Sequence, residues 1–135
     1  MKIVLDTNVF ISAVFFGGPP YRILDAWRSG RVSLVLSAEI IEEYRRVGEE
    51  LGERFEGVDV SPFLQLVVRH AEFVQAEKFT DAVCRDSDDD KFLECAAAAA
   101  AEAIVSGDKD LLTLSAFRSI PILSPRQFID AHLTD

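Results

Sequence analysis

The chain has 135 residues, of which 14 are Lys or Arg and 23 are Asp or Glu, so its formal net charge is −9. This is the length of one domain, at roughly 150 residues per domain. The composition, with 49% hydrophobic and 27% charged residues, is typical of a globular protein rather than a disordered acidic one. The negative charge argues against binding to nucleic acid or to an anionic membrane through Lys and Arg alone. A polyanionic substrate would need positive charge from another source.

The two cysteines and the N-terminus indicate a protein of a reducing compartment. Cys84 and Cys95 have no neighbouring His, which matches neither a disulfide framework nor a zinc-binding pattern. The N-terminus reaches Asp6 before the apolar core of a signal peptide could form, and no apolar run approaches the roughly 18 residues of a membrane span. We therefore expect reduced thiols, a cytoplasmic location and no association with a membrane.

Apolar runs separated by turn residues predict alternating strands and helices in the first half of the chain. Ser37 has the chemistry of a helix N-cap, and Gly30 is suited to end a helix. The predicted elements are, in chain order, a strand over Lys2–Leu5, a helix over Val9–Phe16, a loop over Gly17–Pro20, a helix over Tyr21–Ser29, a strand over Val32–Leu36 and a helix over Ala38–Arg54.

The second half continues this alternation. Ser61 followed by Pro62 predicts an N-cap and a first helical residue, and Ser124 followed by Pro125 predicts the same for the last helix. The predicted elements are a helix over Phe63–Ala71, a short strand over Phe73–Gln75, a helix over Asp89–Ala101, a strand over Ala103–Val105, a helical piece over Leu111–Leu114, a strand over Ile120–Leu123 and a helix ending near Leu133. Short apolar strands joined through helices predict an α/β fold, a single domain over residues 1–135 with a central parallel sheet flanked by helices on both faces.

Acidic residues follow the predicted strands, where open α/β sheets bind their ligands. Asp6 follows the first strand, and both Asp108 and Asp110 follow the strand Ala103–Val105. A single Asp in such a place is commonly a turn or helix-cap residue. Two strand ends together with a third cluster, Asp86–Asp90, favour a functional site.

Two further acidic features have a structural and a functional interpretation. Glu43 lies at the margin of the apolar stripe of its helix, and Glu42 points further toward solvent, although either can be an ordinary surface residue. Acids at the start of a helix are favoured by the helix dipole, by about 0.3 to 1 kcal/mol each. Four Asp in the five positions Asp86–Asp90 exceed that role, because their mutual repulsion would offset the gain unless cations bind.

Several site types are excluded by their missing residues. An EF-hand beginning at Asp86 would need Gly where Lys91 stands and Glu where Ala97 stands. The two histidines, His70 and His132, offer little to zinc or Ser-His-Asp chemistry, and neither a P-loop nor a dinucleotide-binding glycine motif is present. Carboxylates without His or Cys suit Mg²⁺ or Mn²⁺, which would also supply the missing positive charge.

The order and spacing of four motifs resemble the PIN-domain ribonucleases, most closely the VapC-type toxins of toxin–antitoxin pairs. The motifs are Asp6–Val9, Glu43, Asp90–Glu94 and Ser106–Asp110, which together span most of the chain. The resemblance implies a PIN-like fold and metal-dependent hydrolysis of RNA phosphodiesters. It implies in-line attack by water, with Mg²⁺ or Mn²⁺ stabilising the attacking and leaving oxygens and with 5′-phosphate and 3′-hydroxyl products.

The resemblance also implies roles for individual residues. Catalytic roles fall to Asp6, Glu43, Asp90 and Asp108, and metal binding to the same four residues together with Asp110. Glu43 is the candidate to orient or deprotonate the water. Asn8 and Ser106 match polar positions that support the carboxylates, whereas Gly107 departs from the polar residue that many members carry. Glu42, one position before Glu43, and Asp89, one position before Asp90, remain alternatives for these two roles.

The expected partners are an RNA substrate, a cognate antitoxin protein and a second copy of the chain in a homodimer. The apolar segment Val9–Phe16 carries too many large side chains for one buried stripe, so we expect part of it to form an interface unless the next helix covers it. Two other functions remain open. A haloacid-dehalogenase-like phosphatase would need a second Asp where Asn8 stands, and a PIN-fold interaction module would lack catalysis.

Overall fold

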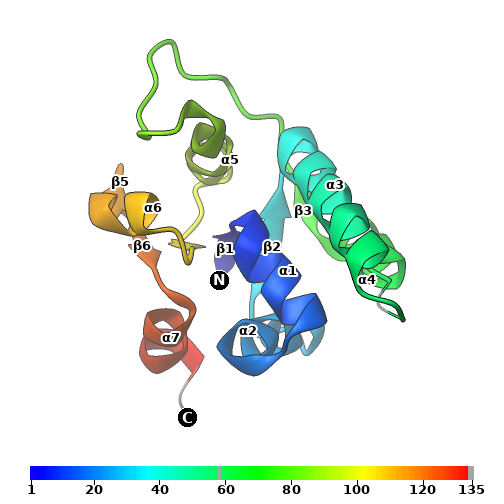
Figure 1. Cartoon of the computed structure of the whole chain (residues 1–135). Helices are drawn as coiled ribbons and strands as arrows, with labels where there is room; N and C mark the ends of the chain where they lie inside the picture. The colour runs from blue at the N-terminus through cyan, green and yellow to red at the C-terminus, as the bar shows by residue number, and fades with distance from the viewer. Residues whose placement is uncertain (58, 134–135) are drawn as a thin grey trace.

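The computed structural model, which describes residues 1–57 and 59–133, contains a mostly parallel sheet with helices on both faces (Figure 1). In the described part of the chain the sheet has six strands in the order β3-β2-β1-β4-β6-β5, and only the β5–β6 pair is antiparallel. The strands are β1 (Lys2–Leu5), β2 (Ser33–Leu36), β3 (Glu72–Phe73), β4 (Ala103–Val105), β5 (Ala116–Phe117) and β6 (Ile120–Leu123). The predicted α/β class and parallel sheet are confirmed.

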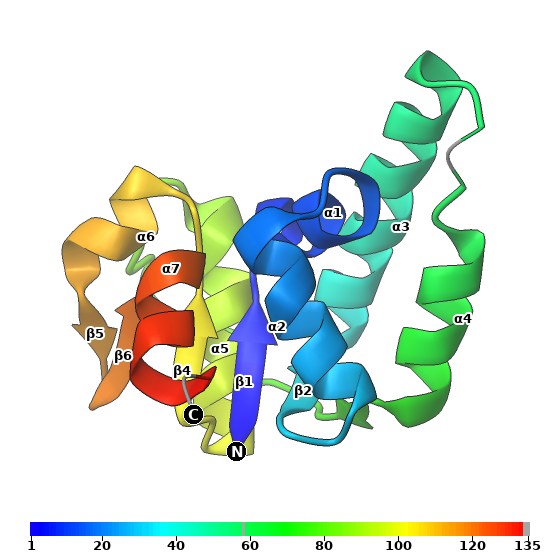
Figure 2. The same cartoon turned by 90° about the horizontal axis from the view of Figure 1, so that it is seen from below.

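The helices divide between the two faces of the sheet. They are α1 (Thr7–Phe15), α2 (Gly18–Arg28), α3 (Ala38–Arg54), α4 (Ser61–His70), α5 (Asp90–Ala99), α6 (Lys109–Leu114) and α7 (Pro125–Phe128), with a 3₁₀ turn η1 (Ser87–Asp89) and a π turn η2 (Ile129–Leu133). Figure 2 shows α2 and α7 in front of the central strands and α5 behind them. On that second face α5 packs against β1, β2 and β4.

The central strands are buried on both sides, as their continuous apolar sequences predict. In β1, Ile3 and Val4 are fully buried, and Leu5 lies opposite Val105 of β4 in a parallel register. Because the strands run in the same direction, the residues that follow them, Asp6 and Ser106, emerge side by side at one edge of the sheet. This edge carries the candidate site.

Helix α5 approaches the sheet closely through its small side chains. Ala96 is fully buried and Ala99 nearly so. The helix ends at Ala99 rather than at Ala101, because Ala100 adopts a left-handed conformation with φ 52° and ψ 48°. The N–H of Ala101 then donates to the carbonyl of Ala96 at 2.9 Å and closes the helix end.

Helices α2 and α4 are among those that begin at a different residue from the one that the sequence predicts. Helix α2 begins at Gly18, since Pro19 and Pro20 occupy its first turn, where the missing N–H of proline leaves no helical hydrogen bond unmade. Helix α4 begins at Ser61 itself, so this residue is not the N-cap that the sequence predicts. The carboxylate of Asp59 accepts a hydrogen bond from the Ser61 N–H at 2.9 Å and so serves the helix start.

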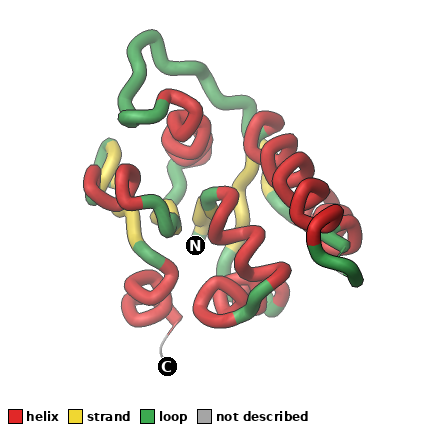
Figure 3. The backbone as a smooth tube through the Cα atoms, in the orientation of Figure 1, coloured by secondary structure: helices red, strands yellow, loops and turns green. Residues whose placement is uncertain are grey.

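Strand β5 is absent from the elements that the sequence predicts. It forms a short hairpin with β6 whose turn residues, Arg118 and Ser119, have positive φ angles of 49° and 68°. Such turns usually contain Gly or Asn, and neither is present, so no turn signal marks the hairpin. The long segment 74–86 between β3 and η1 is irregular and arches from the β3 edge to the start of α5 (Figure 3).

Helix α3 is fixed to α1 and to the end of β1 by one aromatic residue. The ring of Tyr44 stacks on Phe10 with centroids 4.2 Å apart, and its hydroxyl donates to the carbonyl of Leu5. Tyr44 and Phe10 are both fully buried. This contact brings the face of α3 that carries Glu43 next to Asp6.

None of the helices in residues 1–57 and 59–133 combines the length and the apolar character that crossing a membrane requires.

Candidate functional site

Asp6 is held at the junction of β1 and α1 and is only 3% exposed. One carboxylate oxygen, Oδ1, accepts a hydrogen bond from the Val9 N–H at 2.9 Å and caps α1. The other, Oδ2, accepts from the Ser106 hydroxyl and from the Gly107 N–H, the latter at 3.3 Å. The carboxylate therefore joins the ends of β1 and β4.

Ser106 connects the two acids that follow the central strands. Its buried hydroxyl donates to Asp6 and accepts from the N–H of Asp108 at 2.9 Å. Asp108 in turn caps α6, because its Oδ1 accepts from the Asp110 N–H at 2.8 Å. The structure thus places Ser106 between the two acids, where a supporting polar residue is expected.

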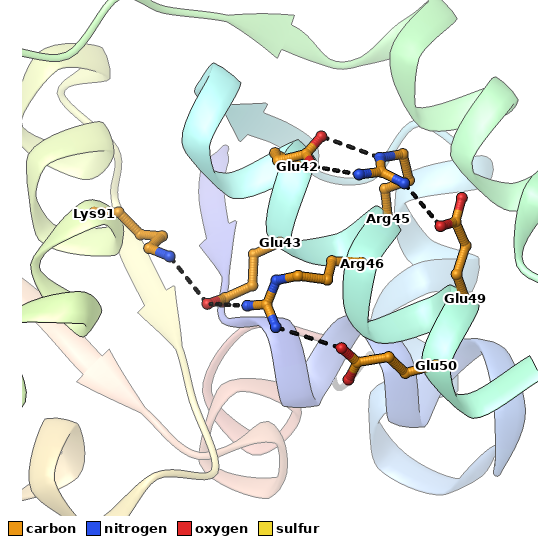
Figure 4. Close-up of polar contacts among 7 residues, drawn as sticks. All are labelled: Glu42, Glu43, Arg45, Arg46, Glu49, Glu50 and Lys91. Carbon is orange, nitrogen blue, oxygen red and sulfur yellow. Dashed lines mark hydrogen bonds and ion pairs between the residues drawn. The ribbon is translucent and has the colours of Figure 1, made fainter. Parts of the chain in front are cut away.

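The neighbouring acids of α3 point in different directions: Glu43 points toward Lys91 of α5, and Glu42 points toward Arg45 of its own helix (Figure 4). The Glu43 side chain is 13% exposed, accepts a hydrogen bond from the Thr7 hydroxyl at Oε2 and lies 2.9 Å from Lys91 Nζ at Oε1. The Glu42 side chain is 61% exposed and is paired with Arg45 on the outer face of the helix. This placement supports Glu43, rather than Glu42, as the candidate residue of the site.

At the start of α5 the structure separates Asp89 from Asp90. The carboxylate of Asp90 accepts hydrogen bonds from the main-chain N–H groups of Cys84 at 2.7 Å and Val83 at 3.1 Å, and it is 6% exposed. Asp90 therefore anchors the preceding loop. Asp89, one residue earlier, lines one cavity with Asp6 and Asp108, which supports Asp89 as the alternative to Asp90 that the sequence leaves open.

A cavity of about 180 Å³ collects the acids that follow β1 and β4 with those of α3 and η1. Its lining residues are Asp6, Thr7, Asn8, Glu43, Val47, Asp89, Phe92 and Asp108. Asp110 does not line it: its side chain is 46% exposed and lies 4.0 Å from Arg85. Four carboxylates from separate parts of the chain therefore share one small cavity.

Burial, together with the nearby negative charges, raises the pKa of two of the cavity acids. Burial, with added repulsion from Asp108 and Asp86, raises the pKa of Asp89 to about 7. Burial also raises the pKa of Asp6, although hydrogen bonds from Ser106 and main-chain N–H groups oppose it. A bound cation would remove the repulsion that makes these ionised carboxylates costly.

The donor set fits a hard divalent cation, because all its charged side chains offer carboxylate oxygens. Within the residues that the structure describes, no three Asp, Glu, His or Cys side chains converge as a ready-made metal centre. Oxygens of Asp6 and Glu43 already accept hydrogen bonds from Ser106, Thr7 and Lys91. Binding of Mg²⁺ or Mn²⁺ would have to draw the carboxylates together.

Two residues at the site are missed by reasoning from the sequence. Thr7 is buried and donates its hydroxyl to Glu43, and Lys91 forms an ion pair with the same carboxylate. The signal for Lys91 is its place as the one basic residue in the acidic segment 86–94. The signal for Thr7 is its position directly after Asp6 at the start of a helix.

The comparisons with known proteins agree with this architecture. Residues 2–110 match the PIN domain family. The chain is 34% identical over 118 residues to the uncharacterized protein MJ1680 of Methanocaldococcus jannaschii, an alignment that covers 84% of this chain and 75% of that protein. The fold is similar to a chain in the crystal structure of VapBC2 from Rickettsia felis bound to a promoter DNA fragment, with a TM-score of 0.58, 12% identity and coverage of 90% of this chain and 97% of the other. The expected PIN-like fold is confirmed, and the chain belongs to the PIN-domain family.

Proposed function

We propose that this protein is a ribonuclease that hydrolyses RNA phosphodiester bonds with Mg²⁺ or Mn²⁺, and that it is the toxin of a toxin–antitoxin pair. The observation that carries the proposal is the single cavity at the carboxyl ends of β1 and β4 that is lined by four carboxylates. Membership of the PIN-domain family supports a nuclease, because the motifs of this sequence resemble the ribonucleases of that family.

Each acid has a proposed task. Asp6, Glu43, Asp89 and Asp108 offer oxygens to the cation, and Ser106 keeps Asp6 and Asp108 in place through its two hydrogen bonds. Glu43 orients the attacking water and takes its proton. The cation, when bound, lowers the pKa of water and stabilises the charge that develops on the phosphodiester oxygens.

The cation also answers the charge problem posed by the sequence. A protein of net charge −9 repels a polyanion, and the four cavity carboxylates would add to that repulsion at the point of cleavage. Divalent cations in the cavity would offset the negative charge of these carboxylates and present positive charge to the phosphodiester. RNA binding should therefore depend on the cation as strongly as cleavage does.

We propose a cognate antitoxin protein as the regulatory partner. The similar solved structure is that of VapBC2 bound to a DNA fragment from its promoter, which supports a paired role for a chain of the same fold. We keep the cytoplasm as the proposed location, since messenger, ribosomal and transfer RNA are all present there.

We also propose a homodimer. The exposed apolar surface available for it is smaller than the sequence predicts. Val9, Phe10 and Ile11 are buried, because α2 and α3 pack on α1. Phe16 remains 67% exposed and contacts Phe55, which is 48% exposed, with ring centroids 6.5 Å apart. Light scattering at micromolar concentrations would give twice the 15.0 kDa chain mass for a dimer, and a mass of one chain at every concentration would refute it.

The haloacid-dehalogenase-like alternative is not carried further, because the chain belongs to the PIN-domain family. The non-catalytic interaction module is an outcome of the decisive experiment. Purified protein is incubated with a structured RNA in Mn²⁺ or in EDTA, beside the Asp6→Asn variant. We expect cleavage only by the wild type with Mn²⁺. No cleavage under any condition would leave the interaction module, and equal cleavage in EDTA would exclude the metal mechanism.

A further inference from the structure

Lys91 joins α5 to α3 across the edge of the acidic cavity. Its ammonium group lies 2.9 Å from Oε1 of Glu43 and 3.3 Å from Oδ1 of Asp88, and its side chain is only 15% exposed. Figure 4 shows Lys91 reaching from α5 to Glu43 on α3. Burial by itself would favour the neutral amine, but the two carboxylates raise the pKa of Lys91, so it stays charged.

Glu43 is held between this ammonium and other groups. The Thr7 hydroxyl donates to its second oxygen, and Arg46 approaches Oε1 only to 3.7 Å. The Arg46 side chain is 54% exposed and lies equally far from Glu50, so its charge is largely screened by solvent. Lys91 is therefore the dominant cation at Glu43.

The approach of Lys91 leaves the cavity itself open. Lys91 does not line the cavity that holds Asp6, Glu43, Asp89 and Asp108, but it lines the neighbouring depression beside Asp88 and Glu94. A cation could thus enter among the four carboxylates while Lys91 stays in place. The ammonium and that cation would then share the carboxylate of Glu43.

We infer that Lys91 is a positioning residue that holds the Glu43 carboxylate at the cavity edge and, by competing for it, weakens the binding of a divalent cation. This inference rests on the proposed metal-dependent function of the cavity. If Lys91 competes with the cation for Glu43, loss of Lys91 strengthens cation binding, whereas a purely structural role predicts the opposite. If Lys91 only tied α5 to α3, its loss would displace Asp89 and Glu43 and weaken cation binding.

The test is a calorimetric titration of the whole chain with Mn²⁺, without RNA. The Lys91→Met variant should bind Mn²⁺ about tenfold more tightly than the wild type, because a positive charge next to the shared carboxylate is gone. Lys91→Arg keeps the charge and should stay within about twofold of the wild type. Lys2→Met is the matched control for loss of one positive charge, since Lys2 pairs with Glu72 at the opposite edge of the sheet and should leave the affinity unchanged.

A second comparison tests whether Lys91 acts through Glu43. In a Glu43→Gln background, Lys91→Met should change the Mn²⁺ affinity by less than about threefold, because the shared carboxylate is absent and only longer-range repulsion is left. Thermal melting in EDTA checks that each variant is folded, and a Lys91→Met variant that fails to fold is replaced by Lys91→Gln.

The outcomes separate this inference from the proposed function. Weaker or unchanged Mn²⁺ binding by Lys91→Met would overturn the inference. So would a Lys91→Met effect that is as large in the Glu43→Gln background as in the wild type. The inference would also fail if none of the proteins bound Mn²⁺. Loss of RNA cleavage by the wild type would instead refute the ribonuclease proposal, while the titrations would still decide the role of Lys91.

Discussion

The hydroxyl of Tyr44 donates a hydrogen bond to the main-chain carbonyl of Leu5; Tyr44 directly follows Glu43, and Leu5 directly precedes Asp6. The contact therefore ties together the two chain segments that bring these acids into one cavity. Because the tyrosine ring is also stacked on Phe10, this one side chain links α3 both to α1 and to the end of β1.

Tyr44→Phe should lower the free energy of unfolding by about 1 to 2 kcal/mol, because the buried Leu5 carbonyl loses its side-chain donor while the stacked ring is kept. Chemical denaturation measures the change. Tyr21→Phe, at a tyrosine that is 41% exposed, is the matched control and should be close to neutral. Equal stability of both variants would show that the Tyr44 hydroxyl does not fix α3.

Glu43→Gln should reduce Mn²⁺-dependent RNA cleavage by about a hundredfold or more, because the proposed base is removed. Glu42→Gln should stay near the wild-type rate, since Glu42 pairs with Arg45 outside the cavity. Initial rates on one RNA substrate compare the two variants, which differ by one position on the same helix. A larger loss for Glu42→Gln would contradict the placement of α3.

Asp89→Asn and Asp90→Asn should differ in their effect on the stability of the fold. Asp89→Asn should abolish cleavage but preserve or raise thermal stability in EDTA, because one of four clustered charges is removed. Asp90→Asn should lower the unfolding free energy by about 1 to 3 kcal/mol, because the N–H groups of Val83 and Cys84 lose a charged acceptor. Melting curves and cleavage rates are measured on both proteins. Loss of stability in Asp89→Asn but not in Asp90→Asn would contradict the prediction.

Ala100→Gly should stabilise the protein by about 0.5 to 1 kcal/mol. Ala100 has a left-handed backbone conformation, in which the Cβ atom is strained and glycine is not. Ala98→Gly, at an exposed position inside the same helix, should instead destabilise it by roughly 0.5 to 1 kcal/mol. Denaturant titrations of the pair give the signs, and a stabilising Ala98→Gly would refute this account of the helix end.

The parallel sheet and the strand-end acids could be predicted from the sequence because both depend on local patterns. The apolar runs Lys2–Leu5 and Ala103–Val105 are followed at once by polar residues, so the parallel register alone brings Asp6 and Ser106 together. Glu43 could be favoured over Glu42 because the periodicity of a long helix places one residue nearer the buried face.

Other features depend on a difference of one residue or on distant contacts. Asp89 and Asp90 are both acids at a helix start, and only the path of the preceding loop decides which of them caps Val83 and Cys84. The pairing of Lys91 with Glu43 joins residues 48 positions apart, which no local pattern reports. The β5–β6 hairpin lacks its usual turn residues, and β5 is too short to be recognised without them.

The irregular segment 74–86 is attached to α5 by acids of that helix. Glu94 accepts a hydrogen bond from the Phe79 N–H at 2.7 Å, as Asp90 does from the N–H groups of Val83 and Cys84. Opening this segment would leave two carboxylates without their donors, so it should unfold together with the first turns of α5. The amides of Phe79, Val83 and Cys84 should then exchange with solvent deuterium at one common rate. That rate should be slower than is usual for a segment without helix or strand.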